Sequence, residues 1–260
     1  MENSNELFTF DAETLTALQT PLRVDPNTVH IWAFELAGPA SCVELCRTWL
    51  SNDECERADR FAFPHLRTRH IIAHGVLRRL LGLYTGTAPQ SLQFSTGKAG
   101  KPSLQTTRPG TAAITFNLTH SETRAAVGVS VGRALGIDLE QLRSNIETLS
   151  ISSHYFFGSE RADIENAPAQ LREATFFRYW VAKEAVLKAE GVGLGFPLDR
   201  FRVEFLRGNT AARIETLDAS LLSGDWTVKV LPCETGWFGA VAAQGERWNL
   251  KLEGPVGINL

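Results

Sequence analysis

The segment G-I-D-L-E at residues 136–140 places two carboxylates at the spacing of metal ligands. In a β-strand, residues two apart point to the same side, so Asp138 and Glu140 would aim at one spot. Two like charges this close stay ionised together most readily when a cation lies between them. Oxygen ligands favour Mg²⁺ or Mn²⁺ over zinc. The alternative is an ordinary exposed strand face.

A third carboxylate lies on a long predicted helix, from about residue 169 to 190, with Gly191 placed as its left-handed cap. Trp180, Glu184 and Lys188 follow one another at four-residue steps and share one stripe of this helix. Glu184 would join the two strand carboxylates, and Lys188 would be a cation facing the same site. The alternative is a plain surface ion pair, but the apolar neighbours indicate the edge of a core.

Two other segments suit a phosphate ligand. The segment N-L-T-H-S at residues 117–121 follows a predicted strand, and a turn there would present N–H groups, hydroxyls and the His120 imidazole. The glycine-containing loop 96–102 carries Lys98 and Lys101, which would act as point charges on phosphate. A structural histidine and a solvated hairpin are the alternatives, since the loop lacks the P-loop pattern.

The elements that must position these residues follow the same order in both halves of the chain. Alternating or apolar runs predict strands at 29–34, 113–118, 125–131, 134–139, 201–206, 226–231 and 237–242. Apolar residues at three- and four-residue steps predict a helix over 66–83 in the first half, matching the helix over 169–190 in the second. The halves would meet near residue 132, and residues 1–27 would be a loose lead-in.

Polar residues around the first-half helices have their own expected roles. Ser51 and Glu54 have the spacing of a capping box, which predicts a helix start. The helix over 66–83 carries four arginines, and we expect most of them to lie in solvent: Arg67, Arg69, Arg78 and Arg79.

Composition narrows the class of protein. The chain has 260 residues, 43% of them hydrophobic and 21% charged, as in ordinary globular proteins. The net charge of −3 gives no bulk case for binding nucleic acid. No apolar run reaches about 18 residues, so no membrane span is expected. The polar start is not a secretory signal, and the four cysteines lack metal spacing, so we expect free thiols and a cytoplasmic protein.

Taken together and in this order, the motifs resemble the Sfp-type 4′-phosphopantetheinyl transferase family. The strongest are G-I-D-L-E at 136–140 and W-V-A-K-E-A-V-L-K at 180–188. Shorter matches are Arg60-Phe61, Gly100-Lys101-Pro102, the segment 117–121 and the glycine-rich segment 191–195. The resemblance runs from about Val29 to Val203 and is expected to continue to the last residue of the sequence.

The resemblance implies an α/β fold of the α+β kind, the 4′-phosphopantetheinyl transferase fold. Two similar subdomains would be related by a pseudo-twofold axis, each a small, mostly antiparallel sheet packed with helices. They would span residues 28–131 and 132–260, with coenzyme A bound at their interface. We expect a monomer, because an internal duplication lets one chain form a complete site.

The resemblance also implies the reaction. The enzyme would be a holo-[acyl-carrier-protein] synthase, which moves 4′-phosphopantetheine from coenzyme A to a serine of an apo acyl or peptidyl carrier protein and releases 3′,5′-ADP. Asp138, Glu140 and Glu184 would hold Mg²⁺, with Mn²⁺ as a possible substitute, and Glu184 and Lys188 would be catalytic. Residues expected to bind coenzyme A are Arg60, Arg69, Lys98, Gly100, Lys101, Pro102, Thr119, His120, Lys183 and Lys188.

The sequence departs from the family pattern at two positions, and two functions other than transfer stay open. Thr119 stands where the family has serine, and Glu54 falls near a position expected to be basic, which leaves the contact to the 3′-phosphate open. One rival is a Mg²⁺-dependent hydrolase of nucleotide pyrophosphates, which would use the same carboxylates. The other is a degenerate relative that only binds coenzyme A or carrier proteins, and the complete set of acidic residues and Lys188 argues against it.

Overall fold

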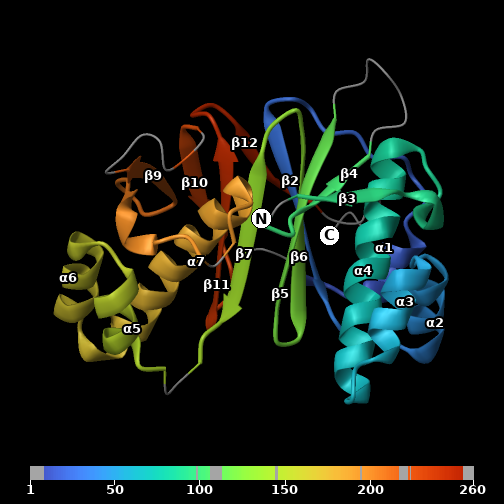
Figure 1. Cartoon of the computed structure of the whole chain (residues 1–260), viewed down its shortest axis with the longest axis horizontal. Helices are drawn as coiled ribbons and strands as arrows, with labels where there is room; N and C mark the ends of the chain where they lie inside the picture. Colours follow the sequence, from blue (N-terminus) through green and yellow to red (C-terminus); the bar gives the residue numbers. More distant parts are fainter. Residues whose placement is uncertain are drawn as a thin grey trace, which may run out of the picture. The chain divides into compact units, whose positions relative to one another are not determined.

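The computed structural model describes residues 9–97, 99–105, 113–143, 146–193, 195–216, 222 and 224–253. Helices and small, mostly antiparallel sheets form an α+β protein (Figure 1). The described chain divides into two compact units. The N-terminal unit holds residues 9–95, 102–132 and 249–253, and the C-terminal unit holds residues 96–101 and 133–248 where they are described.

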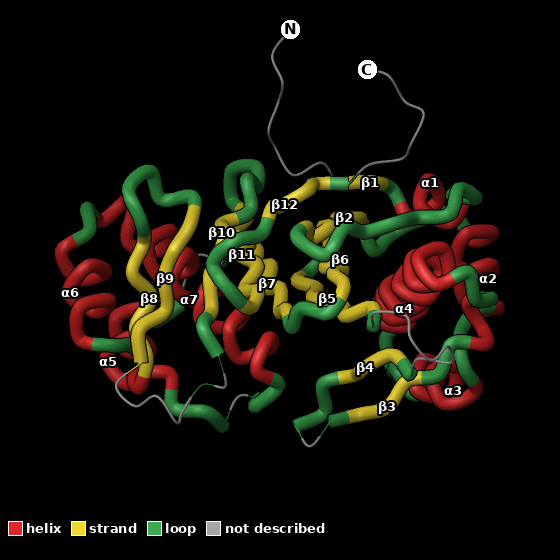
Figure 2. The backbone as a smooth tube through the Cα atoms, turned by 90° about the horizontal axis from the view of Figure 1, so that it is seen from above, coloured by secondary structure: helices red, strands yellow, loops and turns green. Residues whose placement is uncertain are grey.

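The N-terminal unit is built on a five-stranded sheet. Its strands are β1 (Thr9–Phe10), β2 (Thr28–Glu35), β5 (Ile114–Ser121), β6 (Arg124–Val131) and β12 (Asn249–Leu252). β2, β6 and β5 lie side by side in that order (Figure 2) and pair antiparallel, while β1 and β12 both run parallel to β2. Around it are α1 (Ala12–Ala17), α2 (Ala40–Thr48), α3 (Asn52–Asp59), α4 (Pro64–Thr85), η1 (Pro89–Ser91), β3 (Phe94–Thr96) and β4 (Pro102–Leu104).

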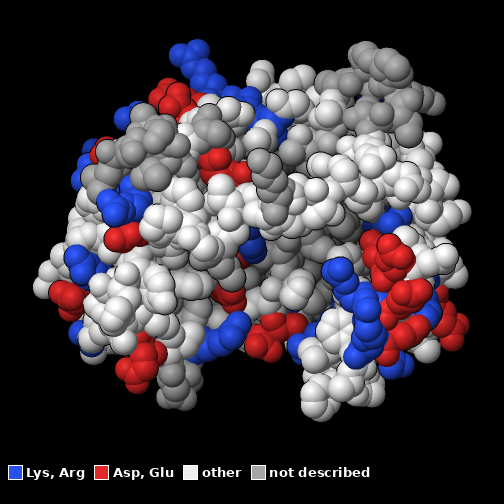
Figure 3. All heavy atoms as spheres, in the orientation of Figure 1, with Lys and Arg blue, Asp and Glu red and all other residues white. Residues whose placement is uncertain are grey.

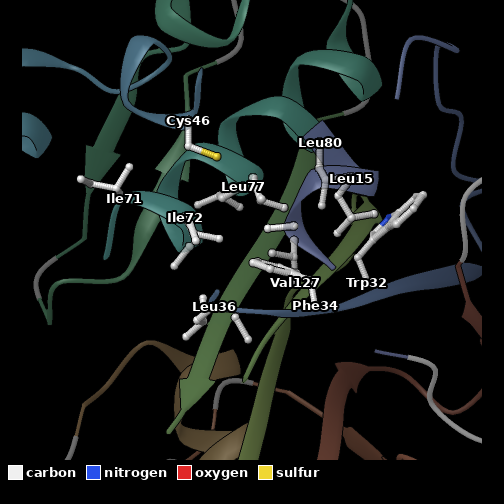
Figure 4. Packing of buried hydrophobic residues seen from close by; sticks show 14 of the residues in the cluster. Leu15, Trp32, Phe34, Leu36, Cys46, Ile71, Ile72, Leu77, Leu80 and Val127 are labelled. Carbon is white, nitrogen blue, oxygen red and sulfur yellow. The ribbon is translucent and has the colours of Figure 1, made fainter. Parts of the chain in front are cut away.

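Helix α4 forms the centre of this unit's core. Pro64 is pre-set for the first turn, and Gly86 ends the helix in the left-handed conformation at φ 68°. The predicted apolar stripe is buried: Ile72, Val76 and Leu80 have no exposed surface. Figure 4 shows Leu80 and Leu77 close to side chains from the sheet, among them Trp32 and Phe34.

Part of the expected lead-in belongs to this core. Residues 9–17 form β1 and α1, and Asp11 caps α1 by accepting a hydrogen bond from the Thr14 N–H at 2.7 Å. Ala12 and Leu15 are fully buried. The expectation of a loose segment up to residue 27 was therefore wrong for residues 9–17, because one face of this short helix is apolar and packs in the core.

Arg78 also differs from the prediction. The capping box of Ser51 and Glu54 at the start of α3 is confirmed. The Arg78 side chain, however, is buried, and its Nε donates to Glu54 at 2.7 Å while Nη1 donates to the Pro89 and Leu92 carbonyls. A buried guanidinium needs such partners. Arg78 therefore ties α3 to α4 instead of lying in solvent.

The C-terminal unit has a second five-stranded sheet in the order β7-β11-β10-β9-β8, antiparallel throughout. Its strands are β7 (Leu135–Gln141), β8 (Phe201–Phe205), β9 (Ala211–Thr216), β10 (Trp226–Val230) and β11 (Trp237–Gln244). Its helices are α5 (Thr148–Tyr155), α6 (Gly158–Asn166) and α7 (Arg172–Glu190), with short turns η2 (Ala169–Leu171) and η3 (Leu198–Arg200). The predicted cap Gly191 has φ 71°, as a left-handed cap requires.

The division of the chain differs from the expected one at its end. The seven predicted strands correspond to β2, β5, β6, β7, β8, β10 and β11, whereas β1, β3, β4, β9 and β12 have no counterpart in the prediction. β12 was expected in the second subdomain, but it pairs with β2 in the N-terminal unit. Residues 96–101, expected in the first subdomain, belong to the C-terminal unit.

The surface and the helices bear on two expected absences. Figure 3 shows acidic and basic side chains in adjoining groups on the face it draws, with no field of a single sign. Among the described residues, no helix is both long and apolar enough to cross a membrane.

Candidate active site

The candidate site is built where α7 lies against β7. A Cβ atom on Gly136 would fall 2.2 Å from both the Ala185 carbonyl oxygen and the Ala189 nitrogen. Only glycine permits this approach of strand to helix. The contact brings the segment that carries Asp138 and Glu140 against the helix that carries Glu184.

Asp138 and Lys188 form the central ion pair. Asp138 is 3% exposed, and its Oδ1 lies 2.6 Å from the Lys188 Nζ. The Lys188 side chain is 31% exposed, so the pair lies at the margin of the core. Glu140, further along β7, is nearer to solvent and accepts a hydrogen bond from the Arg143 Nη2 at 3.2 Å. The strand thus offers one buried and one partly exposed carboxylate.

Glu184 is a buried acid with a raised pKa. It is 7% exposed, and its Oε1 is buried with no hydrogen-bond partner among the described residues. Burial, and then the negative charges of Asp138 and Glu140, raise the pKa of Glu184 to about 7, while Lys188 opposes the rise. A buried carboxyl oxygen without a donor is costly, and a cation beside it would relieve the cost.

These residues match a divalent metal in donor type and charge. Three carboxylates that repel one another are the oxygen donors that Mg²⁺ and Mn²⁺ prefer. Within the described part of the chain, however, no three His, Cys, Asp or Glu side chains are gathered into a formed metal site. The cation that contacts Asp138 Oδ1 in this structure is the ammonium of Lys188. The acids would have to draw together around an ion.

A separate cavity of about 420 Å³ lies in the N-terminal unit. Two residues expected to bind coenzyme A line it, Arg69 and His120. The other lining residues are Leu36, Phe61, His65, Leu66, His70, Ala73, His74 and Glu122. The rings of His70 and His74 lie 4.3 Å apart, and burial lowers the pKa of His74 to about 4. Neither histidine was predicted as a site residue, although their four-residue spacing places both on one face of the predicted helix.

The segment 117–121 is strand where a turn was expected. All five residues belong to β5, and the turn follows at Glu122, which has φ 47°. Thr119 is 3% exposed, whereas His120 reaches the surface of the cavity, because neighbours on a strand point to opposite faces. The prediction of a phosphate-binding turn at these residues was therefore wrong in its local structure.

The other described residues expected to bind coenzyme A do not line this cavity. Arg60 is exposed at the end of α3, and Gly100 and Pro102 are exposed near the β3–β4 turn. Lys98 lies outside the described residues. Lys101 is partly buried in the C-terminal unit, where its Nζ donates to the Leu135 carbonyl at 2.9 Å and to the Ala189 carbonyl at 2.8 Å.

Lys183 does not agree with its expected role at the phosphates. Its side chain is fully buried, and its Nζ lies 2.9 Å from Glu160 Oε2. The same Nζ donates to the Leu198 carbonyl at 2.8 Å and to the Phe201 carbonyl at 2.7 Å. An ammonium has three donors, so none remains for a ligand. Glu160, its partner, was not singled out from the sequence.

Comparisons with known proteins agree on one family. A family described as the 4′-phosphopantetheinyl transferase superfamily matches residues 134–238, the region of β7 and α7. The 4′-phosphopantetheinyl transferase HetI of Nostoc sp. (strain PCC 7120) is 34% identical over 226 residues, covering 87% of this chain and 92% of HetI.

Two further relatives match over shorter regions. A putative 4′-phosphopantetheinyl transferase of Synechocystis sp. is 31% identical over 58% of this chain and 61% of its own length. The transferase Sfp of Bacillus subtilis (strain 168) is 26% identical over 62% of this chain and 68% of its own length. Given the match to HetI along nearly its whole length, this chain belongs to the 4′-phosphopantetheinyl transferase superfamily.

Proposed function

We propose that this enzyme transfers the 4′-phosphopantetheine group of coenzyme A to a serine hydroxyl of an apo acyl or peptidyl carrier protein. The observation that carries the proposal is the cluster of Asp138, Glu184 and Lys188 on β7 and α7, inside the region that matches the superfamily. Buried carboxylates beside an ammonium suit transfer of a charged phosphoryl-type group, which depends on positioning and charge stabilisation.

The residues divide the chemistry between them. The serine oxygen forms a bond to the β-phosphorus of coenzyme A as the bond to the oxygen of 3′,5′-ADP breaks. Glu184, which has a buried oxygen without a donor among the described residues, is the group placed to accept the serine proton. Lys188, partly exposed next to Asp138, stabilises the charge that develops on the departing 3′,5′-ADP.

A divalent cation completes this proposal. Asp138, Glu140 and Glu184 would hold Mg²⁺, or Mn²⁺ in its place, through carboxylate oxygens. When bound, the ion would draw charge from the pyrophosphate of coenzyme A. The mutual repulsion of the three acids supports the assignment, because the pKa of Glu184 is raised by both strand carboxylates.

Compartment and assembly are part of the proposal. We place the enzyme in the cytoplasm as a single chain that binds neither nucleic acid nor membrane. Four free cysteines support a reducing compartment, and the face drawn in Figure 3 carries charges of both signs instead of the basic surface that favours nucleic acid.

Intact-mass spectrometry of an apo carrier protein tests the function. With this enzyme, coenzyme A and Mg²⁺, we expect the carrier to gain one phosphopantetheine group, and the gain to disappear with EDTA. Fatty-acid, polyketide and nonribosomal-peptide carriers should be tried side by side. Asp138→Asn should abolish the gain, whereas Asp163→Asn, on α6 of the same unit, should keep it.

The failing outcomes identify the rival functions. If no carrier gains mass while coenzyme A is consumed, the enzyme is a hydrolase of the pyrophosphate bond. If no carrier gains mass and coenzyme A binds unchanged, the protein is a binding adaptor. If transfer continues in EDTA, the metal assignment is wrong.

A further inference from the structure

We propose that the buried Glu160–Lys183 pair is a positioning device that fixes the rotation of α7, so that Glu184 and Lys188 face β7. The inference rests on the proposed function, because it concerns how those two residues are held. It also gives a role to Lys183, which the structure removes from the phosphates.

Both members of the pair also form hydrogen bonds to main-chain groups. Lys183 Nζ donates to the carbonyls of Leu198 and Phe201 as well as contacting Glu160. Glu160 accepts from the Val203 N–H at 2.7 Å and from the Phe157 N–H at 3.0 Å. Both side chains are essentially without exposed surface, at 0% and 1%. Main-chain partners cannot swing away as side chains do, so Lys183 joins α7 to the start of α6 and the start of β8.

Helix geometry explains why this anchor matters for the site. Successive residues of an α-helix are about 100° apart around its axis. Ala185 and Ala189, which press on Gly136 of β7, therefore lie about 200° and about 240° from Lys183, on the opposite side of α7. Glu184 and Lys188 lie about 100° and about 140° from Lys183, between the two contacts. α7 is thus held on two opposite sides, and the site residues lie between them.

A charged anchor suits rotation better than an apolar one. An apolar contact changes little when a helix turns by a small angle, since the hydrophobic effect is non-directional. A buried ammonium and carboxylate lose their hydrogen bonds on the same turn, and an unpaired buried charge costs several kcal/mol by general experience. A turn of about 20° would move groups on the outer radius of the helix by about 2 Å. Displacements of about 1 Å can cost about a hundredfold in rate.

Two variants separate positioning from plain stability. Glu160→Gln keeps the side-chain shape and the acceptor for Val203 but removes the negative charge. The double variant Lys183→Met/Glu160→Leu replaces both charges by apolar groups. It also removes the partners of the Phe157 and Val203 N–H groups and of the Leu198 and Phe201 carbonyls, so we expect some loss of stability and its folding is checked first. The matched control is Tyr179→Phe, which removes the 2.5 Å hydrogen bond from the Tyr179 hydroxyl to Asp163, also between α6 and α7.

Thermal unfolding first shows that each variant is folded. Three quantities are then measured on each folded variant. They are kcat and KM for the carrier, Mn²⁺ affinity by electron paramagnetic resonance, and amide hydrogen exchange of residues 184–188. In the double variant we expect kcat and Mn²⁺ affinity to fall by at least about tenfold, with KM for the carrier within about twofold. Exchange at 184–188 should quicken, and Tyr179→Phe should match the wild type.

The proposal is overturned if the folded double variant keeps wild-type kcat, Mn²⁺ affinity and exchange. It is equally overturned if Tyr179→Phe produces the same losses, because any α6–α7 contact would then suffice. If the double variant does not fold, Glu160→Gln is judged by the same criteria. Hydrogen exchange needs neither metal nor carrier protein, so it still decides the question if the proposed transfer reaction itself fails.

Discussion

Two lysines on α7 show how differently one motif can use the same residue type. Lys183 has no exposed surface and all three donors engaged, whereas Lys188 is 31% exposed beside Asp138. They lie five positions apart on the helix, which turns the second about 140° away from the first. Only the second side chain lies where a ligand could meet it.

Lys188→Ala should therefore lower turnover more than affinity for coenzyme A. Loss of one charge-stabilising donor typically costs about 10²–10³ in kcat. Steady-state kinetics and coenzyme A binding by calorimetry measure the two effects separately. Lys251→Ala, an exposed lysine of the N-terminal unit, is the matched control and should change neither. A wild-type kcat in Lys188→Ala would show that Lys188 is an ordinary surface residue.

Lys101 should make the stability of the protein depend on pH in the alkaline range. Burial lowers the pKa of Lys101 from 10.5 to about 8, against the attraction of Glu190. Between these two pH values the unfolded chain holds a proton that the folded chain has released, so the free energy of unfolding rises with pH. Below about pH 8 both states are protonated, and this contribution is flat.

Urea unfolding at several pH values tests this assignment. The wild type should gain stability relative to Lys101→Arg from about pH 8 to about pH 10, because arginine stays charged there. An equal pH dependence of the two proteins would mean that the Lys101 ammonium is not desolvated in the folded state.

At the scale of elements, the site depends on how closely one strand approaches one helix. A Cβ on Gly136 would meet main-chain atoms of Ala185 and Ala189 at 2.2 Å, and main chain cannot rotate out of the way. Gly136→Ala should therefore push α7 off β7, with a loss of about 1–3 kcal/mol in the free energy of unfolding. Activity should fall by at least about tenfold, because Glu184 and Lys188 move with the helix.

Gly158→Ala is the matched control for that change. A Cβ on Gly158 meets only the Arg161 side chain, at 3.7 Å, in the same unit. Gly158→Ala should match the wild type closely in both thermal unfolding and transfer rate. If Gly136→Ala were equally harmless, the close approach of β7 and α7 would not be needed for the site.

At the scale of the whole molecule, the chain returns to its first unit at its end. β12 adds Asn249–Leu252 to the edge of β2, and Glu253 follows with a 2.6 Å contact to the buried His30. His30 Nδ1 also lies 2.8 Å from the Tyr84 hydroxyl at the end of α4. The last strand therefore closes the sheet of the N-terminal unit.

A chain ending at Trp248 should lose stability mainly in the N-terminal unit. At about 1 kcal/mol per hydrogen bond, losing this strand should lower the free energy of unfolding of that unit by about 2–4 kcal/mol. Hydrogen exchange should quicken in β2 and α4 before β7 and β11. Equal loss of protection in all four elements would show that the two units unfold as one.

The sequence by itself determined the family and most of the regular elements, and it pointed to the carboxylates of the candidate site. Strand alternation and helical periodicity are local, so β7, α7 and the cap at Gly191 could be read from neighbouring residues. The motif spacing then implied that Asp138, Glu184 and Lys188 act together, and the structure brings these three side chains together.

Only the tertiary structure decided which charged side chains are buried and which partners they find. The Glu160–Lys183 pair, the Arg78–Glu54 pair and the return of β12 to β2 each join residues on different elements. No local pattern marks them, because burial of a charge depends on what other segments place around it. Periodicity tells which face of an element is apolar, while long-range packing decides whether a lysine on that element meets a ligand or a carboxylate.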